Sequence, residues 1–155
     1  MKNKVAHAAL TVIFASSLLL STAGFAAAEK RACSLGQSAG NWAFTDNGTV
    51  VGVGPRTAVG IFTLDGAGNL TNGVATSSLN GNVAQETFSG TYTVNSDCSG
   101  AVSLTIYSGG TEILALTVNL AFDNDMKEMR GIFSSASLPD GTQLLTVINL
   151  DARKQ

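Results

Sequence analysis

A short segment that recurs after thirty residues constrains the fold of this chain more than any other feature. GIFTLD at 60–65 returns as GTYTVN at 90–95, and GIFS at 131–134 is a weaker third copy. Each copy alternates residues of two kinds and runs into or lies just ahead of turn residues, as an antiparallel strand does. The repeat therefore predicts a sheet and indicates which side chains share its inner face.

The rest of the chain after residue 28 shows the same strand pattern and no convincing helical periodicity. Turns rich in Gly, Asn, Asp and Ser separate the strand candidates. The predicted strands are 41–46, 57–64, 70–78, 83–94, 101–108, 111–122, 128–135 and 142–151. Successive strands with short connections predict an all-β, up-and-down antiparallel meander. Closing it into a small barrel removes the exposed strand edges.

The period of two residues along a strand predicts the interior of this barrel. In the fourth strand the even positions include Glu86, Phe88 and Tyr92, while the odd positions are mainly Gln, Thr and Ser. The repeat carries this phase to Phe62, and we expect even-numbered side chains from Ala58 to Leu150 to face one axis. On the third strand the predicted inward residues are polar: Asn72, Thr76 and Ser78.

Three charged side chains fall in the inward phase near the starts of alternate strands: Arg56, Glu86 and Glu112. An unpaired charge in an apolar interior is very costly, so these groups are expected to be wet or paired. Pairing of Glu86 with Arg56 or Lys127 is the plainest arrangement. The longest predicted loop, 47–55, opens at the same end and suits a mobile flap. The sequence thus predicts an open mouth at this end.

The N-terminal 28 residues have the pattern of an export signal. Lys2 and Lys4 precede an apolar stretch, and small residues at 26–28 suit a signal peptidase. We predict a signal peptide over 1–28, a single barrel domain over 29–155 and a secreted or periplasmic protein. In an oxidising compartment Cys33 and Cys98 are expected to pair. Their bond would pin the N-terminal segment across the closed end of the barrel.

Composition removes several classes of function. The only histidine, His7, lies in the predicted signal peptide, so we expect no imidazole chemistry, metal or cofactor. Nine Lys and Arg stand against eleven Asp and Glu, without a basic patch, which argues against nucleic acid as a partner. Outward Thr, Ser and Gln, without aromatic girdles, argue against insertion into a membrane.

Two resemblances add to this interpretation. Gly40-Asn41-Trp42 resembles the Gly-x-Trp element of calycins, the lipocalin and avidin-like barrels. That likeness implies a barrel with an aromatic floor and an open mouth. Separately, FTLDGAGN at 62–69 and GTYTVN with DCSG over 90–100 are similar to a group of uncharacterised secreted bacterial proteins. This second likeness implies no function.

Three hypotheses for function follow, with the oligomeric state open. The first is a secreted, non-enzymatic protein that binds a small apolar ligand in the barrel. Its predicted ligand-binding residues are Arg56, Phe62, Glu86, Phe88, Tyr92 and Glu112. The second is a structural or adhesive surface module with a filled interior. The third is a barrel isomerase or cyclase with Glu86 as its acid or base. The volume of the interior separates the first two.

Overall fold

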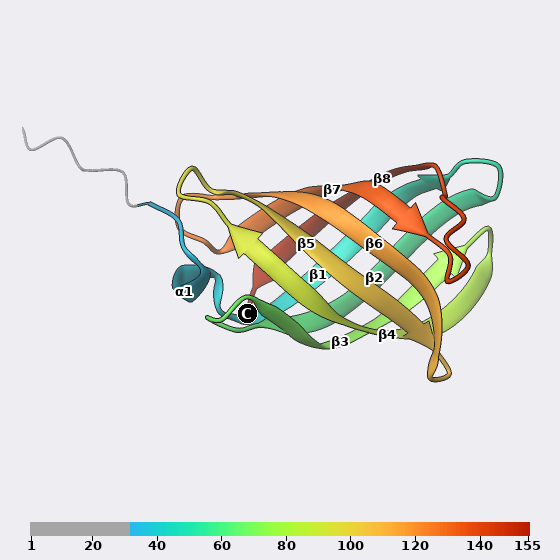
Figure 1. The fold of residues 1–155 in the computed structure, drawn as a ribbon, viewed down its shortest axis with the longest axis horizontal. Helices are drawn as coiled ribbons and strands as arrows, with labels where there is room; N and C mark the ends of the chain where they lie inside the picture. Colours follow the sequence, from blue (N-terminus) through green and yellow to red (C-terminus); the bar gives the residue numbers. More distant parts are fainter. Residues whose placement is uncertain (1–31) are drawn as a thin grey trace, which may run out of the picture.

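A computed structural model describes residues 32–155; the predicted signal peptide lies outside the described residues. These residues form one short helix, α1, and eight strands (Figure 1). Their bounds are α1 Leu35–Ser38, β1 Gly40–Val50, β2 Gly54–Leu64, β3 Asn69–Leu79, β4 Asn82–Val94, β5 Ser99–Ser108, β6 Thr111–Phe122, β7 Glu128–Ser137 and β8 Thr146–Lys154.

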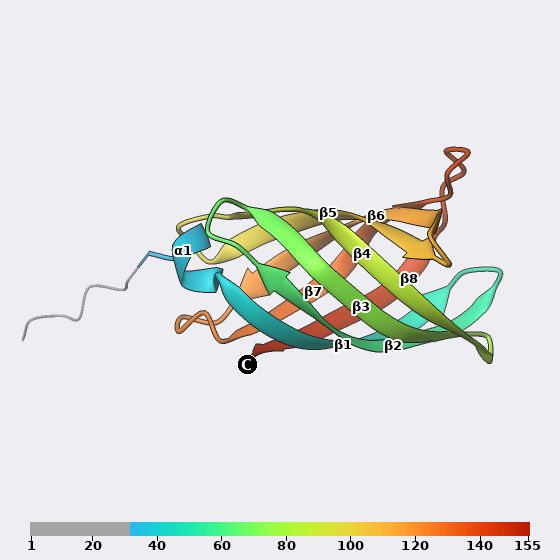
Figure 2. The same ribbon diagram turned by 90° about the horizontal axis from the view of Figure 1, so that it is seen from below.

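The strands form a closed antiparallel barrel, which confirms the predicted fold class. Each strand pairs with its neighbours in sequence, and β1 also pairs with β8, from Trp42 opposite Lys154 to Val50 opposite Thr146. The two views of the ribbon show the strands crossing the long axis of the barrel obliquely (Figure 1, Figure 2). Turns and one longer loop lie at the end away from α1.

The alternation along the strands produces the core. In β4 the even positions Glu86, Phe88 and Tyr92 are buried, and the Gln, Thr and Ser side chains between them are exposed. The same phase buries Phe62 in β2 and, in β6, Leu116, Val118, Leu120 and Phe122. Alternation of apolar and polar residues is what a sheet with one dry face requires. The predicted inward phase is therefore confirmed for these strands.

The predicted flap at 47–55 is wrong, because most of that segment is strand. Asn47 pairs with Thr57 and Val50 with Gly54, so only residues 51–53 form the turn between β1 and β2. The longest connection joins β7 to β8, and β8 begins at Thr146 rather than at the predicted residue 142. A hydrogen bond of 2.8 Å from Val51 N to Leu145 O ties the turn to this connection.

Three bulges change the phase that strict alternation predicts. In β3 the register shifts between Leu70 and Gly73, where Asn72 has a φ of 54°, so that odd residues face inward afterwards. The expected inward positions of Asn72, Thr76 and Ser78 are wrong, and Ser77 is buried instead. A bulge adds one residue to one strand and reverses the direction of the side chains that follow.

In β6 the extra residue is Ile113, because Tyr107 faces Glu112 whereas Ile106 faces Leu114. In β7 odd residues such as Met129 and Phe133 are buried, and the phase returns to even at Ala136 after a third bulge. The expectation that only even-numbered side chains face the axis therefore fails in β3 and β7.

α1 closes one end of the barrel, which we call the floor (Figure 1). Trp42 is fully buried there and its indole N–H donates to Ser38 O at 2.9 Å. The Ser38 hydroxyl lies 3.0 Å from the Tyr92 hydroxyl, which in turn donates to Asp65 O at 2.5 Å. Every buried side-chain polar group at this end thus has a partner, as a stable interior requires.

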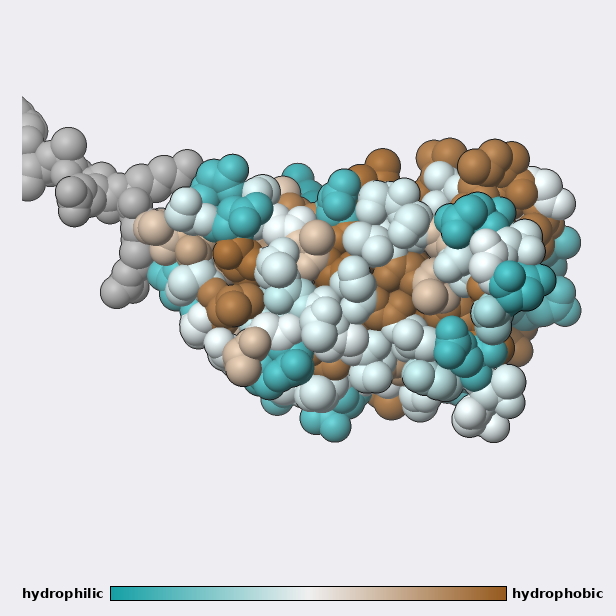
Figure 3. Space-filling view, viewed as in Figure 1, coloured by the Kyte–Doolittle hydropathy of each residue, from teal (hydrophilic) through white to brown (hydrophobic). Residues whose placement is uncertain are grey.

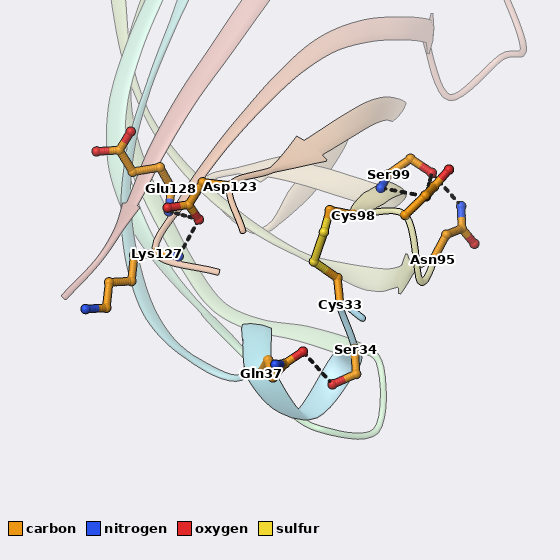
Figure 4. Close-up of a disulfide and its surroundings, with 10 residues drawn as sticks. Cys33, Ser34, Gln37, Asn95, Cys98, Ser99, Asp123, Lys127 and Glu128 are labelled. Carbon is orange, nitrogen blue, oxygen red and sulfur yellow. Dashed lines mark hydrogen bonds between the residues drawn. A yellow bond between two sulfur atoms is a disulfide. The ribbon is translucent and has the colours of Figure 1, made fainter. Parts of the chain in front are cut away.

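The disulfide between Cys33 and Cys98 is confirmed and fastens α1 to the turn before β5 (Figure 4). Both half-cystines are buried, and Cys33 N also donates to Ser96 O at 3.3 Å. A disulfide of this kind indicates an oxidising, extracytoplasmic environment. Within residues 32–155, the structure contains no helix with the length and apolar character needed to cross a bilayer.

Removing this disulfide should destabilise the barrel strongly. The bond spans 65 residues, so the double variant Cys33→Ser, Cys98→Ser is expected to lose about 4 kcal/mol of unfolding free energy through chain entropy. Urea unfolding under non-reducing conditions measures this loss. The exposed Ser96→Ala, in the same turn, should change stability by less than about 0.5 kcal/mol. A double variant as stable as the parent would show that the bond does not hold the floor.

Candidate functional site

A buried ionic cluster lies inside the barrel toward the end opposite α1. The Arg56 guanidinium donates to both carboxylate oxygens of Glu86, at 3.2 and 3.1 Å. Its Nη2 also lies 3.4 Å from Asp46 Oδ2, and the Ser77 hydroxyl donates to Glu86 Oε1 at 2.6 Å. We call Asp46, Arg56 and Glu86 the triad. Three strands, β1, β2 and β4, supply the triad, and β3 supplies Ser77.

The triad is deeply buried. Asp46 is 2% exposed, Glu86 6% and Arg56 9%, and the buried Val50 and Ile148 hold the inward positions nearer the end of the barrel. Asp46 shares the Arg56 guanidinium with Glu86. Burial therefore influences the pKa of Asp46 more than Arg56 does. Burial raises the pKa of Asp46 above its ordinary value of 3.8, although Arg56 opposes the shift.

Two polar atoms of the triad have no hydrogen-bond partner among the described residues: Asp46 Oδ1 and Arg56 Nε. Both belong to the Asp46–Arg56 pair, whose single contact of 3.4 Å is long for a charged hydrogen bond. An unpaired buried donor or acceptor costs about 1 to 3 kcal/mol. Among residues 32–155, the site therefore holds one donor and one acceptor without a hydrogen-bond partner.

An apolar cavity of about 50 Å³ adjoins the triad, and all three triad residues line it. Phe44 lies at the next inward position to Asp46 in β1, and Phe88 at the next inward position to Glu86 in β4. Their rings pack edge to face at 5.6 Å, and both contact Phe62. Gly60 makes this cluster possible, because a Cβ there would lie 2.7 Å from the Phe44 ring.

The structure brings most of the predicted site residues together. Arg56, Glu86, Phe62 and Phe88 all line the cavity, and the expected pairing of Glu86 with Arg56 is confirmed. Tyr92 contributes its ring to the wall, while its hydroxyl is held at the floor. Arg56 and Glu86, which were expected to be either wet or paired, are paired and buried.

Glu112 is the exception. It is exposed and does not line the cavity, because the bulge at Ile113 interrupts the alternation of β6 just after it. The inward phase read from Leu114 to Phe122 consequently does not extend back to this residue. The predicted grouping of Glu112 with Arg56 and Glu86 is corrected by this bulge.

Sequence analysis missed Asp46 and Ser77. Asp46 continues the alternation of Trp42 and Phe44, but it was placed at the end of the predicted first strand, where a turn residue is expected. Extending that alternation by one step would have found it. Ser77 carries no such signal, because only the bulge in β3 turns its hydroxyl toward Glu86.

Exposed apolar side chains gather at the same end of the barrel. The space-filling view shows brown surface over the β1–β2 turn and the β7–β8 connection (Figure 3). The large exposed apolar side chains of these segments and of the start of β8 are Val51, Val53, Leu138, Leu145 and Val147. We call this set the apolar rim. Contiguous exposed apolar surface on a monomer is often functional.

Comparison with known proteins supports the fold alone. No protein-family model matches the sequence, and no curated protein matches it. Among solved structures, the chain is similar to EF1p2_mFAP2b bound to DFHBI, with a TM-score of 0.56 and 14% identity over 81% of this chain and 98% of that one. A redesigned beta barrel, mFAP1, bound to DFHBI, gives a TM-score of 0.49 and 18% identity over 79% and 98% of the two chains.

Removing the cation of the triad should destabilise the protein far more than removing the whole triad. Arg56→Met leaves two buried carboxylates without a counter-charge, which costs about 3 to 5 kcal/mol. The triple variant Asp46→Leu, Arg56→Met, Glu86→Leu replaces the cluster by apolar side chains and is expected to be at least as stable as the parent. Urea unfolding compares them, and a triple variant as weak as Arg56→Met would contradict this account.

The raised pKa of Asp46 predicts a pH dependence of stability with a definite sign. The folded protein binds the proton of the Asp46 carboxyl more tightly than the unfolded chain does. The contribution of Asp46 to the free energy of unfolding therefore falls as pH rises from 3.8 through the folded pKa. Relative to Asp46→Asn, the parent should lose stability over that range in urea unfolding at successive pH values.

A control carboxyl should behave in the opposite way. Hydrogen bonds from Asn69 lower the pKa of Asp65, a partly exposed residue just before the turn between β2 and β3. Its contribution to the free energy of unfolding is therefore lost as pH falls. The difference between the parent and Asp65→Asn should therefore grow with rising pH. Stability differences that change with pH in the same direction for the two variants would contradict the assignment.

Proposed function

We propose that this protein is an extracytoplasmic binding protein that holds a small, largely apolar molecule inside the barrel, against the triad. One observation carries the proposal: Asp46 Oδ1 and Arg56 Nε lie unpaired beside an apolar cavity. Binding sites for small molecules commonly combine an apolar wall with a few polar groups that orient the ligand.

Stability does not account for the triad. Buried ion pairs rarely stabilise a fold better than apolar residues of similar size, because both charges lose their hydration. The floor shows that this barrel can satisfy its buried polar side chains, as the bonds among Trp42, Ser38 and Tyr92 illustrate. The incomplete pairing of Asp46 with Arg56 contrasts with that end, and it supports a role for the triad toward a partner molecule.

The size of the cavity limits the ligand. About 50 Å³ is roughly a third of the cavity that binds benzene in an engineered protein core. A ligand larger than a few atoms therefore requires Phe44, Phe62 and Phe88 to turn aside. The barrel EF1p2_mFAP2b, which shares the fold, was solved bound to DFHBI, so a barrel of this kind is compatible with a bound molecule.

The small volume also favours a second candidate function, the structural or adhesive surface module. In that case the interior serves only as a core, and the exposed Thr and Ser rows or the apolar rim would make the contacts. The two functions differ in one measurable property, because only the first requires a molecule to enter the barrel.

Filling the cavity should abolish binding. Ala75 lines the cavity, and Ala75→Val places two additional carbons there. Native mass spectrometry after incubation with lipid and aromatic extracts is expected to show a retained compound with the parent. The variant should show at least a tenfold lower bound fraction, since the added carbons take the space of the ligand.

Ala121→Val is the matched control, because it makes the same change at an exposed position of β6 and should bind as the parent does. Thermal unfolding of both variants checks that each one folds. A parent that retains no compound from any extract would contradict binding and support the structural module.

A further inference from the structure

We infer that the ligand is a neutral molecule with a hydroxyl group, which binds between Asp46 Oδ1 and Arg56 Nε and carries an apolar body. The inference rests on the proposed function and specifies the chemistry of its ligand. It follows from the two unpaired atoms, from the charge of the triad and from the nature of the cavity wall.

The two unpaired atoms require one donor and one acceptor. Asp46 Oδ1 can only accept a hydrogen bond when the carboxyl is ionised, and the Arg56 Nε–H can only donate one. Both side chains are more than nine-tenths buried, at 3% and 9% exposure, so bulk water does not satisfy them. A hydroxyl group donates one hydrogen bond and accepts others, and it does so through a single oxygen atom.

Other head groups satisfy only one of the two atoms. An ether or ketone accepts from Arg56 Nε and leaves Asp46 Oδ1 unpaired, whereas an ammonium group donates to Oδ1 and leaves Nε unpaired. An amide or an undissociated acid offers both functions, but on two separate heavy atoms joined through a carbon rather than on a single oxygen. The hydroxyl is therefore the smallest group that completes the site.

The charge of the triad disfavours anions. Glu86 already receives two hydrogen bonds from Arg56 and one from Ser77, so the guanidinium is committed to a carboxylate within the protein. A ligand carboxylate would meet the second carboxylate, Asp46, in a buried site. Like charges at close range in a poorly solvated interior repel strongly. A neutral head group avoids this repulsion.

The wall beyond the triad specifies the body of the ligand. Phe44, Phe62 and Phe88 adjoin the triad, and Val102 and Val118 are among the aliphatic residues that continue the cavity. Tyr92 is the remaining polar residue of the described lining, and its hydroxyl is engaged at the floor. Polar substituents away from the hydroxyl would thus be buried without partners, at a cost that an apolar body does not incur.

A matched series of ligands tests the inference. Hexanol, methyl pentyl ether, hexylamine and hexanoate share a slender apolar body and differ in the head group. Titrations of the parent protein followed by NMR chemical shifts should rank hexanol first, with the ether at least tenfold weaker, which is about 1.4 kcal/mol. Hexanoate should be weaker still, because its carboxylate meets Asp46. Hexylamine should bind less tightly than hexanol, because its ammonium group leaves Arg56 Nε unpaired. Hexanamide is added as the larger head group that also donates and accepts, and it should bind less tightly than hexanol.

The triple variant Asp46→Leu, Arg56→Met, Glu86→Leu supplies the control. It retains an apolar interior but lacks both unpaired atoms, so its ratio of hexanol to ether affinity should fall to about one. A conserved ratio would show that the preference arises elsewhere in the barrel and would overturn the inference.

The remaining outcomes separate this inference from the proposed function. An ether, amine, amide or carboxylate that binds as tightly as hexanol overturns the hydroxyl assignment and leaves interior binding in place. A crystal structure of the hexanol complex in which a water molecule, and not the hexanol hydroxyl, lies between Asp46 Oδ1 and Arg56 Nε also overturns it. Failure of all the compounds to bind, together with no compound retained from extracts, overturns the proposed function as well.

Discussion

The pairing of β1 with β8 is the constraint on which the rest of the structure depends. Because that ladder runs from Trp42 and Lys154 to Val50 and Thr146, the sheet closes and every strand has two neighbours. Closure leaves no free edge along the ladder and places all inward side chains in one narrow interior. A polar side chain that faces inward must then find its partner inside, and this is what brings Asp46, Arg56 and Glu86 together from three strands.

The two ends of the barrel meet that requirement differently. At the floor, α1 supplies the Ser38 carbonyl and hydroxyl, so that Trp42 and Tyr92 are both hydrogen-bonded. At the triad, four donor or acceptor contacts are made and two atoms stay unpaired. The floor has the properties of a structural element held by a disulfide, whereas the triad has those of a site whose hydrogen bonds are incomplete. This difference between the two ends supports the proposed binding function.

Much of this architecture was accessible from the sequence. The repeat at 60–65 and 90–95 predicts the phase of β2 and β4, and both strands bury the expected residues because their alternation is uninterrupted. The pairing of Cys33 with Cys98 follows from an oxidising compartment, and the structure confirms it. Pairing of Glu86 with Arg56 or Lys127 follows from the cost of an unpaired buried charge, and the structure pairs it with Arg56. Asp46 was missed because an aspartate after an aromatic strand resembles the start of a turn, and the same judgement led to the wrong flap at 47–55.

The sequence by itself determined the all-β fold, the dry face of most strands and the disulfide, because these follow from local alternation and from the chemistry of two cysteines. Only the tertiary structure decided the direction of Ser77 and Glu112, the burial of the triad and the two atoms it leaves unpaired. The physical reason is that bulges arise where a closing sheet must bend, and one extra residue reverses every side chain after it. No local pattern records that reversal, so the contents of the interior were settled by closure.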